Sequence, residues 1–214
     1  MTPAERELLD AGARWFDVEL DAVSSDRIAR FLALLAVWNR RTRLTAETDQ
    51  EAVIAKHVVD SLAVVPFLPR SGTVVDIGSG AGFPGIIVGS VRPDLRLVLI
   101  ESRRRRASFL RESVRTIPLP AATVVEIRAE AAAETALAGS ARLVVARAVR
   151  LDAFLPLAVP LLGPGGKALA MQTPRTAGLA SRISAACGLR LSQRHDYVLP
   201  GGAARTLLTF ERAS

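Results

Sequence analysis

The stretch from residue 74 to residue 85, Val-Val-Asp-Ile-Gly-Ser-Gly-Ala-Gly-Phe-Pro-Gly, restricts the fold of this chain more than any other segment. A short β-branched run ends at Asp76 and Ile77, three glycines follow at alternate positions, and an apolar segment resumes at Ile86. This pattern predicts a buried strand, a tight turn with room for a ligand, and a helix whose N-terminus faces that ligand. The turn therefore predicts a site for a nucleoside-containing cofactor.

A carboxylate further along the chain narrows the choice of cofactor. Glu101 ends the next apolar run, about twenty residues on, where it can accept hydrogen bonds from ribose hydroxyls. A dinucleotide fits poorly, because Phe83 stands where its fingerprint requires a third glycine. Asp76 would repel a pyrophosphate, whereas it suits the sulfonium and ammonium groups of S-adenosylmethionine. The sequence thus predicts S-adenosylmethionine, bound by Asp76, Gly78, Gly80 and Glu101; an NAD-dependent enzyme is a distant alternative.

Length and composition point to one substantial α/β domain with a helical extension. The chain has 214 residues, half of them hydrophobic and only 5% aromatic, so we expect an aliphatic core. The N-terminus is polar and acidic, and the longest apolar stretch, 153–171, is interrupted by prolines. The single cysteine, Cys187, can form neither an internal disulfide nor a metal cluster. We therefore expect a cytoplasmic protein with no membrane segment, no metal and no obligate protein partner.

Positive charge is concentrated after residue 72. Residues 1–72 carry 9 basic and 11 acidic side chains, whereas residues 73–214 carry 19 basic and 10 acidic ones. The net charge of the second part is therefore +9, against −2 for the first. A basic cofactor-binding region is where a polyanionic substrate such as a nucleic acid would bind.

Hydrophobic periodicity divides the chain into a helical segment, 1–70, and an alternating segment, 71–214. We predict the first as a helical cap and the second as one compact methyltransferase domain. Expected helices in the cap are 3–20, 26–39 and 49–67, each with apolar residues at helical spacing. Expected strands are 73–77, 95–101, 122–128, 141–146, 167–172, 190–197 and 205–211, and expected helices 85–91, 103–116, 131–137, 153–162 and 175–186.

This alternation predicts a doubly wound, mostly parallel sheet. The last two strands are joined by Leu-Pro-Gly-Gly, a hairpin turn, so the final strand should be antiparallel. Seven strands with a terminal hairpin match the Rossmann-like fold of class I S-adenosylmethionine-dependent methyltransferases better than a dehydrogenase. Ligands bind such sheets at the carboxyl ends of the strands. That rule brings residues 76–83, Glu101, Ala129, Glu130, Arg147 and Gln172 into one neighbourhood.

Six segments in a fixed order carry a resemblance to a known family. They are Trp-Asn-Arg-Arg with Leu-Thr-Ala (38–46), His-Val-Val-Asp-Ser (57–61), the loop Gly-Ser-Gly-Ala-Gly-Phe-Pro-Gly (78–85), Ser-Arg-Arg-Arg-Arg-Ala-Ser-Phe-Leu-Arg (102–111), Arg-Ala-Glu (128–130) and Ala-Arg-Ala (146–148). Together they resemble the RsmG family (GidB, glucose-inhibited division protein B) from about residue 31 to residue 210. Members of that family transfer a methyl group from S-adenosylmethionine to N7 of a guanine in bacterial 16S ribosomal RNA.

The resemblance implies roles for single residues. Gly78 and Phe83 would contact the cofactor at the loop, Ala129 and Glu130 would frame its adenine, and Arg147 would reach it from the fourth strand. The chain departs from the family where Gln172-Thr173 replaces Lys-Gly and Arg43 replaces Asn, both where RNA would be expected. Near the end of the chain, Arg205 keeps the family's arginine, which we expect to contact RNA.

A helix that we expect to be capped by Ser102 presents Arg104, Arg111 and Arg115, here called the arginine stripe, on its outward face. The stripe suits contacts with RNA phosphates, although a solvated helix surface is an equally good interpretation. Another helix carries His57, Asp60 and Ser61 on adjacent turns, which we interpret as a brace between the cap and the sheet rather than a catalytic set. For Arg147 we prefer a ligand contact to a structural ion pair.

No catalytic base is visible, and methylation at N7 needs none, because that nitrogen has a free lone pair at neutral pH. Catalysis would then depend on holding the reacting atoms in line. Two other functions stay open on the residues alone: a small-molecule methyltransferase, which Gln172 keeps possible, and a module that binds the cofactor and RNA without turnover.

Overall fold

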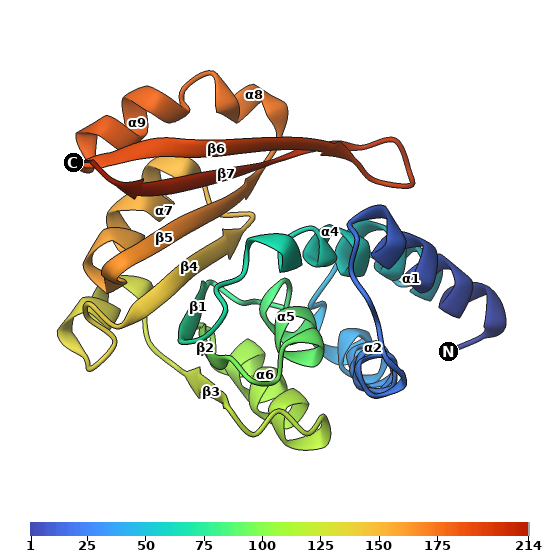
Figure 1. Ribbon diagram of the computed structural model, residues 1–214. Helices are drawn as coiled ribbons and strands as arrows, with labels where there is room; N and C mark the ends of the chain where they lie inside the picture. Colours follow the sequence, from blue (N-terminus) through green and yellow to red (C-terminus); the bar gives the residue numbers. More distant parts are fainter. Residues whose placement is uncertain (214) are drawn as a thin grey trace.

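The computed structural model describes residues 1–213 as a seven-stranded sheet with helices on both faces (Figure 1). The strand order is β3-β2-β1-β4-β5-β7-β6, and β7 runs antiparallel to β5 and β6 while the other neighbouring pairs are parallel. This arrangement confirms the predicted α/β class with an antiparallel last strand.

Five strands lie within one residue of their predicted bounds, whereas the third ends three residues earlier and the fifth begins five residues earlier than predicted. The structure places them at β1 (Thr73–Ile77), β2 (Arg96–Ile100), β3 (Ala122–Val125), β4 (Ala141–Arg147), β5 (Leu162–Gln172), β6 (Leu189–Val198) and β7 (Ala204–Arg212). The connecting helices are α5 (Gly85–Val91), α6 (Arg104–Thr116), η3 (Ala129–Glu134), α7 (Leu151–Ala158), η4 (Val159–Leu161), α8 (Pro174–Ala177) and α9 (Ala180–Ala186).

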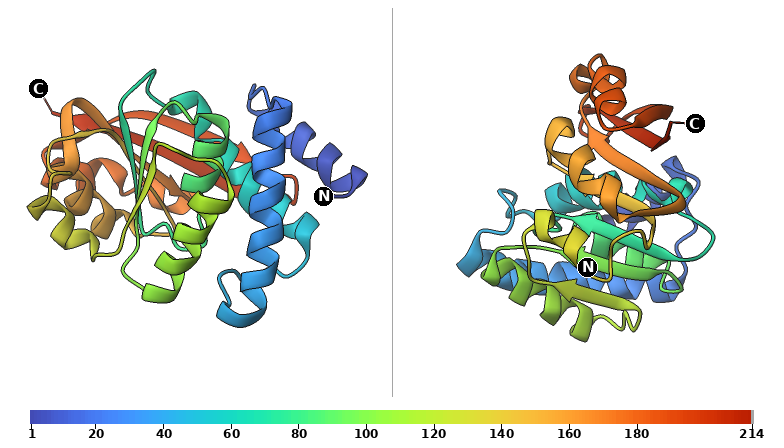
Figure 2. Two further views of the ribbon diagram at one scale, coloured as in Figure 1. Left: turned by 90° about the horizontal axis from the view of Figure 1, so that it is seen from below. Right: turned by 90° about the vertical axis from the view of Figure 1, so that its left-hand side faces the viewer.

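Alternate residues of the strands build two separate cores, because successive side chains of a strand point to opposite faces. On one face, Val74, Leu99 and Val145 pack with α5, α6 and the N-terminal helices. On the other, Val75 and Ile100 pack with η3, α7 and α9. The two views of Figure 2 show helices on opposite sides of the sheet, with the N-terminal helices (blue) on one side only.

The N-terminal segment consists of α1 (Pro3–Trp15), α2 (Ala22–Thr42), α3 (Gln50–Val53), η1 (Ile54–Val58), α4 (Val59–Leu62) and η2 (Val65–Phe67). Thr2 and the N3 residue Glu5 form a capping box at the start of α1, which satisfies two orphan backbone donors. Phe31 of α2 is fully buried and contacts both Phe83 and Phe109 of the second segment. The helical segment therefore shares one core with the sheet.

Several predicted helix boundaries were wrong. The helix expected at 49–67 is interrupted by η1, a π-helical turn that carries His57. The first helix ends at Trp15 rather than at residue 20, and the segment after β3 is a 3₁₀-helix. Ser102 does not cap α6: the N-cap residue is Arg103, and the cap has no side-chain hydrogen bond.

Candidate cofactor site and adjoining cavity

The glycine loop between β1 and α5 is fixed to the end of β2. The amides of Gly78 and Ser79 both donate to the carbonyl of Ile100, at 2.9 and 3.1 Å. Gly80 donates its amide to Oε2 of Glu101 at 3.1 Å. Gly78 and Gly80 have φ angles of +71° and +54°, in the left-handed region that favours glycine. The loop and the carboxylate predicted to bind the ribose therefore form one hydrogen-bonded unit.

Asp76 lies beneath the loop and holds the start of α5. Its side chain is completely buried, and Oδ2 accepts a hydrogen bond from the amide of Gly85 at 3.1 Å. A Cβ on Gly85 would lie only 2.6 Å from that oxygen, so only glycine lets the helix approach this closely. Gly85 thus fills the packing role of the third glycine in a dinucleotide fingerprint, which the sequence reasoning had looked for at Phe83.

Two observations test whether these residues fit S-adenosylmethionine. The Oδ1 atom of Asp76 is buried and has no hydrogen-bond partner among residues 1–213, and burial raises the pKa of this carboxyl to about 7. A cationic ligand nearby would stabilise the ionised form of this carboxyl. Gly78 is exposed between buried neighbours, and a Cβ there would meet nothing closer than Val149, at 3.6 Å. The loop is therefore open on the side where the cofactor is expected, and the residues fit it.

The ring of Phe83, in the glycine loop, packs against Arg147 and His57. The guanidinium carbon of Arg147 lies 5.0 Å from the centroid of the Phe83 ring, and the His57 ring lies 5.3 Å from it. Burial, followed by the charge of Arg147, lowers the pKa of His57 to about 4. The guanidinium can only donate, so His57 accepts through Nδ1, 3.1 Å from the Arg147 Nη1 atom. His57 is therefore neutral at physiological pH, with its proton on Nε2.

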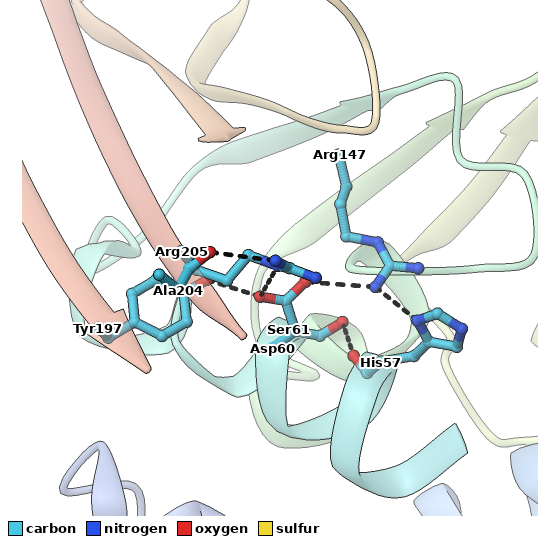
Figure 3. A network of polar contacts seen from close by, with 7 residues as sticks. All are labelled: His57, Asp60, Ser61, Arg147, Tyr197, Ala204 and Arg205. Atoms are coloured by element: carbon cyan, nitrogen blue, oxygen red, sulfur yellow. Dashed lines mark hydrogen bonds and ion pairs between the residues drawn. The ribbon is translucent and has the colours of Figure 1, made fainter. Parts of the chain in front are cut away.

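Asp60 of α4 is the centre of a polar network (Figure 3). The Tyr197 hydroxyl donates to its Oδ1 at 2.6 Å, and Arg147 donates to its Oδ2 at 3.4 Å. The Nε atom of Arg205 lies 3.9 Å from Oδ1. Ser61 is not in contact with the carboxylate, because its hydroxyl donates to the carbonyl of His57 at 2.6 Å. These contacts match the brace predicted between the helical segment and the sheet. Arg147, for which a ligand contact was preferred, forms an ion pair with Asp60.

A cavity of about 530 Å³ is lined in part by residues of this network, namely His57, Asp60, Arg147 and Arg205. Its walls come from η1 and α4, from the ends of β4 and β5, and from β7. Val149, which lies over Gly78, also lines it, so the cavity adjoins the glycine loop. We call it the arginine cavity, and its polar lining includes Lys56, His57, Asp60, Arg147, Gln172 and Arg205.

The remaining predicted residues lie at varying distances from this centre. Ala129 is half-buried and Glu130 exposed at the start of η3, which follows β3. The arginine stripe is exposed on α6, and its middle residue, Arg111, forms a 2.7 Å ion pair with Glu126. The stripe residues do not line the arginine cavity, whereas Arg205 does.

The two departures from the family occupy different environments. Gln172 lines the cavity, and its Nε2 donates to the carbonyl of Val149 at 2.8 Å. Arg43, expected near RNA, instead caps the end of α2 in the left-handed conformation, with φ of 46°. Asparagine favours that conformation, so the family's residue there has a structural explanation. Tyr197 was missed altogether, because no local pattern links it to a carboxylate 137 residues away.

Among residues 1–213, none of the helices has both the length and the apolar character needed to cross a membrane. The sheet order, the glycine loop after β1 and the carboxylate after β2 define the class I methyltransferases. Solved structures agree on the fold. TrmN from Thermus thermophilus has a TM-score of 0.60 at 18% identity, covering 82% of this chain and 53% of that one. TYW2 from M. jannaschii in complex with AdoMet has a TM-score of 0.59 at 15% identity, covering 73% and 76%.

The sequence comparisons identify the family. The profile described as "GidB: rRNA small subunit methyltransferase G" matches residues 24–191. The ribosomal RNA small subunit methyltransferase G of Geobacter sp. (strain M21) is 36% identical over 99% of this chain and 100% of its own length. That of Chromohalobacter salexigens is 34% identical over the whole of both chains. The chain belongs to the rRNA small subunit methyltransferase G family, and it is an S-adenosylmethionine-dependent methyltransferase of 16S rRNA.

Proposed function

We propose that this chain transfers a methyl group from S-adenosylmethionine to N7 of a guanine in 16S rRNA, in the cytoplasm where small ribosomal subunits assemble. Family membership supports the cofactor and the RNA. The choice of N7 among the nitrogen and oxygen atoms of a nucleotide rests on the chemistry of the arginine cavity.

The observation that carries the choice of N7 is that the titratable groups of the cavity are already engaged. Asp60 accepts from Tyr197 and Arg147, and Glu47 forms a 2.8 Å ion pair with Lys56. His57 has its Nδ1 lone pair directed at Arg147. Methylation of an exocyclic amine or a ribose hydroxyl needs a base to take a proton, whereas N7 presents a lone pair directly. A cavity without a free base therefore favours N7.

We assign the cofactor to the glycine loop and the strand ends around it. Below the loop, the positive charge of the cofactor would favour the ionised form of the Asp76 carboxyl. The exposed Gly78 would leave room above the loop, and Gly80 would hold the loop to Glu101. The Glu101 oxygens accept from the amides of Gly80 and Arg103, and their remaining lone pairs would accept from the ribose hydroxyls. Phe83 and Arg147 would bound the cofactor toward the cavity, and the 3₁₀-helix that begins at Ala129 and Glu130 would flank its adenine. When bound, S-adenosylmethionine supplies a methyl group on a positively charged sulfur.

The target guanine completes the reaction without a proton transfer. Bound S-adenosylmethionine would supply an electrophilic methyl group, and N7 would accept it through a lone pair that carries no proton. The methylated purine ring would then carry a positive charge. The protein's part is to align the reacting atoms and to bind the RNA, for which we propose the arginine stripe and Arg205.

The assignment to N7 can be tested by removing that atom. A small-subunit RNA in which 7-deazaguanosine replaces guanosine only at the site methylated in unmodified RNA keeps the base-pairing edge but has a carbon in place of N7. With labelled S-adenosylmethionine we expect incorporation into the unmodified RNA and none into the substituted one. Equal incorporation into both RNAs would show that another atom is methylated.

A further inference from the structure

The arginine cavity is distinct from the glycine loop but adjoins it. Asp76, Gly78, Gly80 and Glu101 do not line the cavity, whereas Val149, which lies over Gly78, does. Its volume of about 530 Å³ is in the range of about 300–1,000 Å³ typical of small-molecule sites. The position beside the cofactor site is where the second reactant of a transfer must enter.

The cavity carries positive charge, which suits a nucleotide with its phosphate. Its lining includes four basic side chains, Lys56, Arg147, Arg150 and Arg205, against two carboxylates, Glu47 and Asp60. Two of the basic groups are held by acidic neighbours outside the network, since Lys56 pairs with Glu47 and Arg150 with Asp152. Arg147 and Arg205 lie 3.4 and 3.9 Å from the Asp60 carboxylate instead, and Arg205 also donates through Nη1 to the carbonyl of Ala204 at 3.1 Å.

One buried carboxylate therefore lies close to both guanidinium groups. The Asp60 side chain is 5% exposed, whereas those of Arg147 and Arg205 are 19% and 31% exposed. Within residues 1–213, Arg147 makes its hydrogen bonds only through Nη1, to His57 and Asp60, which leaves Nε and Nη2 for a ligand. The hydroxyl of Tyr197 fixes the other side of the carboxylate.

The partners of Asp60 come from distant parts of the chain but lie on one face of the sheet. Arg147 ends β4, Tyr197 lies in β6 and Arg205 in β7, whereas Asp60 belongs to the helical segment (Figure 3). The π-helical turn η1 immediately before α4 places His57 in the same network. A π-turn of this kind often occurs at functional sites, since it changes the direction of side chains within a helix.

We propose that the arginine cavity receives the target nucleotide and that Asp60 is its positioning residue, holding Arg147 and Arg205 so that their free N–H groups meet the anionic nucleotide. This inference rests on the proposed function, because it takes RNA as the second reactant. A brace that serves only stability would tie the same elements together without affecting how RNA binds.

The test compares the variants Asp60→Asn, Arg205→Ala and the double variant. Asp60→Asn keeps the shape of the side chain but removes its charge, so RNA should bind at least tenfold more weakly and KM for RNA should rise by a similar factor. Because Asp60 acts partly through Arg205, the double variant should lose less than the product of the two single losses. Leu155→Ala, in the core on the opposite face of the sheet, is the control for lost stability alone.

Leu155→Ala should lower Tm yet leave Kd and KM for RNA within about twofold, at a temperature where every variant is folded. Affinity for RNA unchanged in Asp60→Asn, or losses that simply multiply in the double variant, would overturn the proposal. If Asp60→Asn does not fold, Arg205→Ala decides, since unchanged RNA affinity in that variant contradicts the proposal equally. Kd for RNA is measured without turnover, so failure of the methylation reaction would be recognised separately.

Discussion

Gly85 allows α5 to pack closely against the end of β1. A Cβ on this glycine would lie 2.3 Å from Cδ2 of Leu99 and 2.6 Å from Oδ2 of Asp76, and both neighbours are fully buried. Gly85→Ala should therefore cost about 1–3 kcal/mol in the free energy of unfolding. Urea unfolding followed by circular dichroism measures the loss.

Gly178 at the end of α8 is the matched control for that substitution. Its φ is −64°, and nothing lies within 4 Å of where a Cβ would be. Gly178→Ala should leave stability unchanged or raise it by about 0.4–1 kcal/mol. Equal effects of the two substitutions would contradict the close approach at Gly85.

His57 should titrate well below an ordinary histidine. Burial and the charge of Arg147 lower its pKa to about 4, so between about pH 4 and 6.5 the unfolded chain binds a proton that the folded one does not. This histidine therefore makes stability rise with pH across that window. The chain has two histidines, so NMR titration of the wild type and of His195→Gln assigns the signal. A midpoint near 6.5 for His57 would contradict its desolvated contact with Arg147.

Among the secondary-structure elements, α6 carries the arginine stripe, which we expect to contact RNA phosphates. Arg104→Ala with Arg111→Ala removes two such contacts and should reduce the salt slope of RNA binding by about 1.5. The 2.7 Å ion pair of Arg111 with Glu126 is exposed, so its loss should change stability by less than about 1 kcal/mol.

Arg182→Ala provides the charge control, because that arginine is exposed on α9 at the opposite face of the sheet. It should leave the salt slope nearly unchanged. If the stripe variant has the wild-type slope, or if Arg182→Ala lowers the slope as much, the stripe is an ordinary solvated helix surface.

The bounds of some helices and strands could be predicted from the sequence, whereas others could not. The bounds of β1 and α5 were predicted correctly, since β-branched residues, glycines and a proline mark both ends of each. The helix expected at 49–67 was wrong within its length, because apolar spacing does not reveal one wide π-turn. The cap expected at Ser102 failed as well, since the helix begins after Arg103 without a side-chain cap.

For the site, the glycine loop could be predicted from the sequence because the residues that form it are contiguous in the chain. The network around Asp60 could be read only in part. His57, Asp60 and Ser61 are close in sequence, so a brace could be predicted, but its partners in β4, β6 and β7 depend on how the sheet is assembled. Contacts over such separations follow from topology rather than from any local pattern.

At the scale of the whole molecule, the two predicted parts share one hydrophobic core. Phe31, Ile54 and Val58 of the helical segment are fully buried in the cluster that covers one face of the sheet. We therefore expect a fragment of residues 71–214 to lose fixed side-chain packing and to bind hydrophobic dyes. Near-ultraviolet circular dichroism and thermal unfolding measure this; a cooperative transition in the fragment would show that residues 71–214 form an independent domain.

We expect the glycine loop and the adjoining arginine cavity to act together in methylating a guanine of 16S rRNA at N7. This expectation is tested most directly with labelled S-adenosylmethionine and small ribosomal subunits from a strain lacking this enzyme, followed by borohydride and aniline, which cleave RNA at 7-methylguanine. The wild-type enzyme should incorporate label and produce one new cleavage in the small-subunit RNA. Gly78→Asp should do neither, because its side chain would occupy the open side of the loop. Incorporation without that cleavage, or full activity in Gly78→Asp, would contradict this expectation.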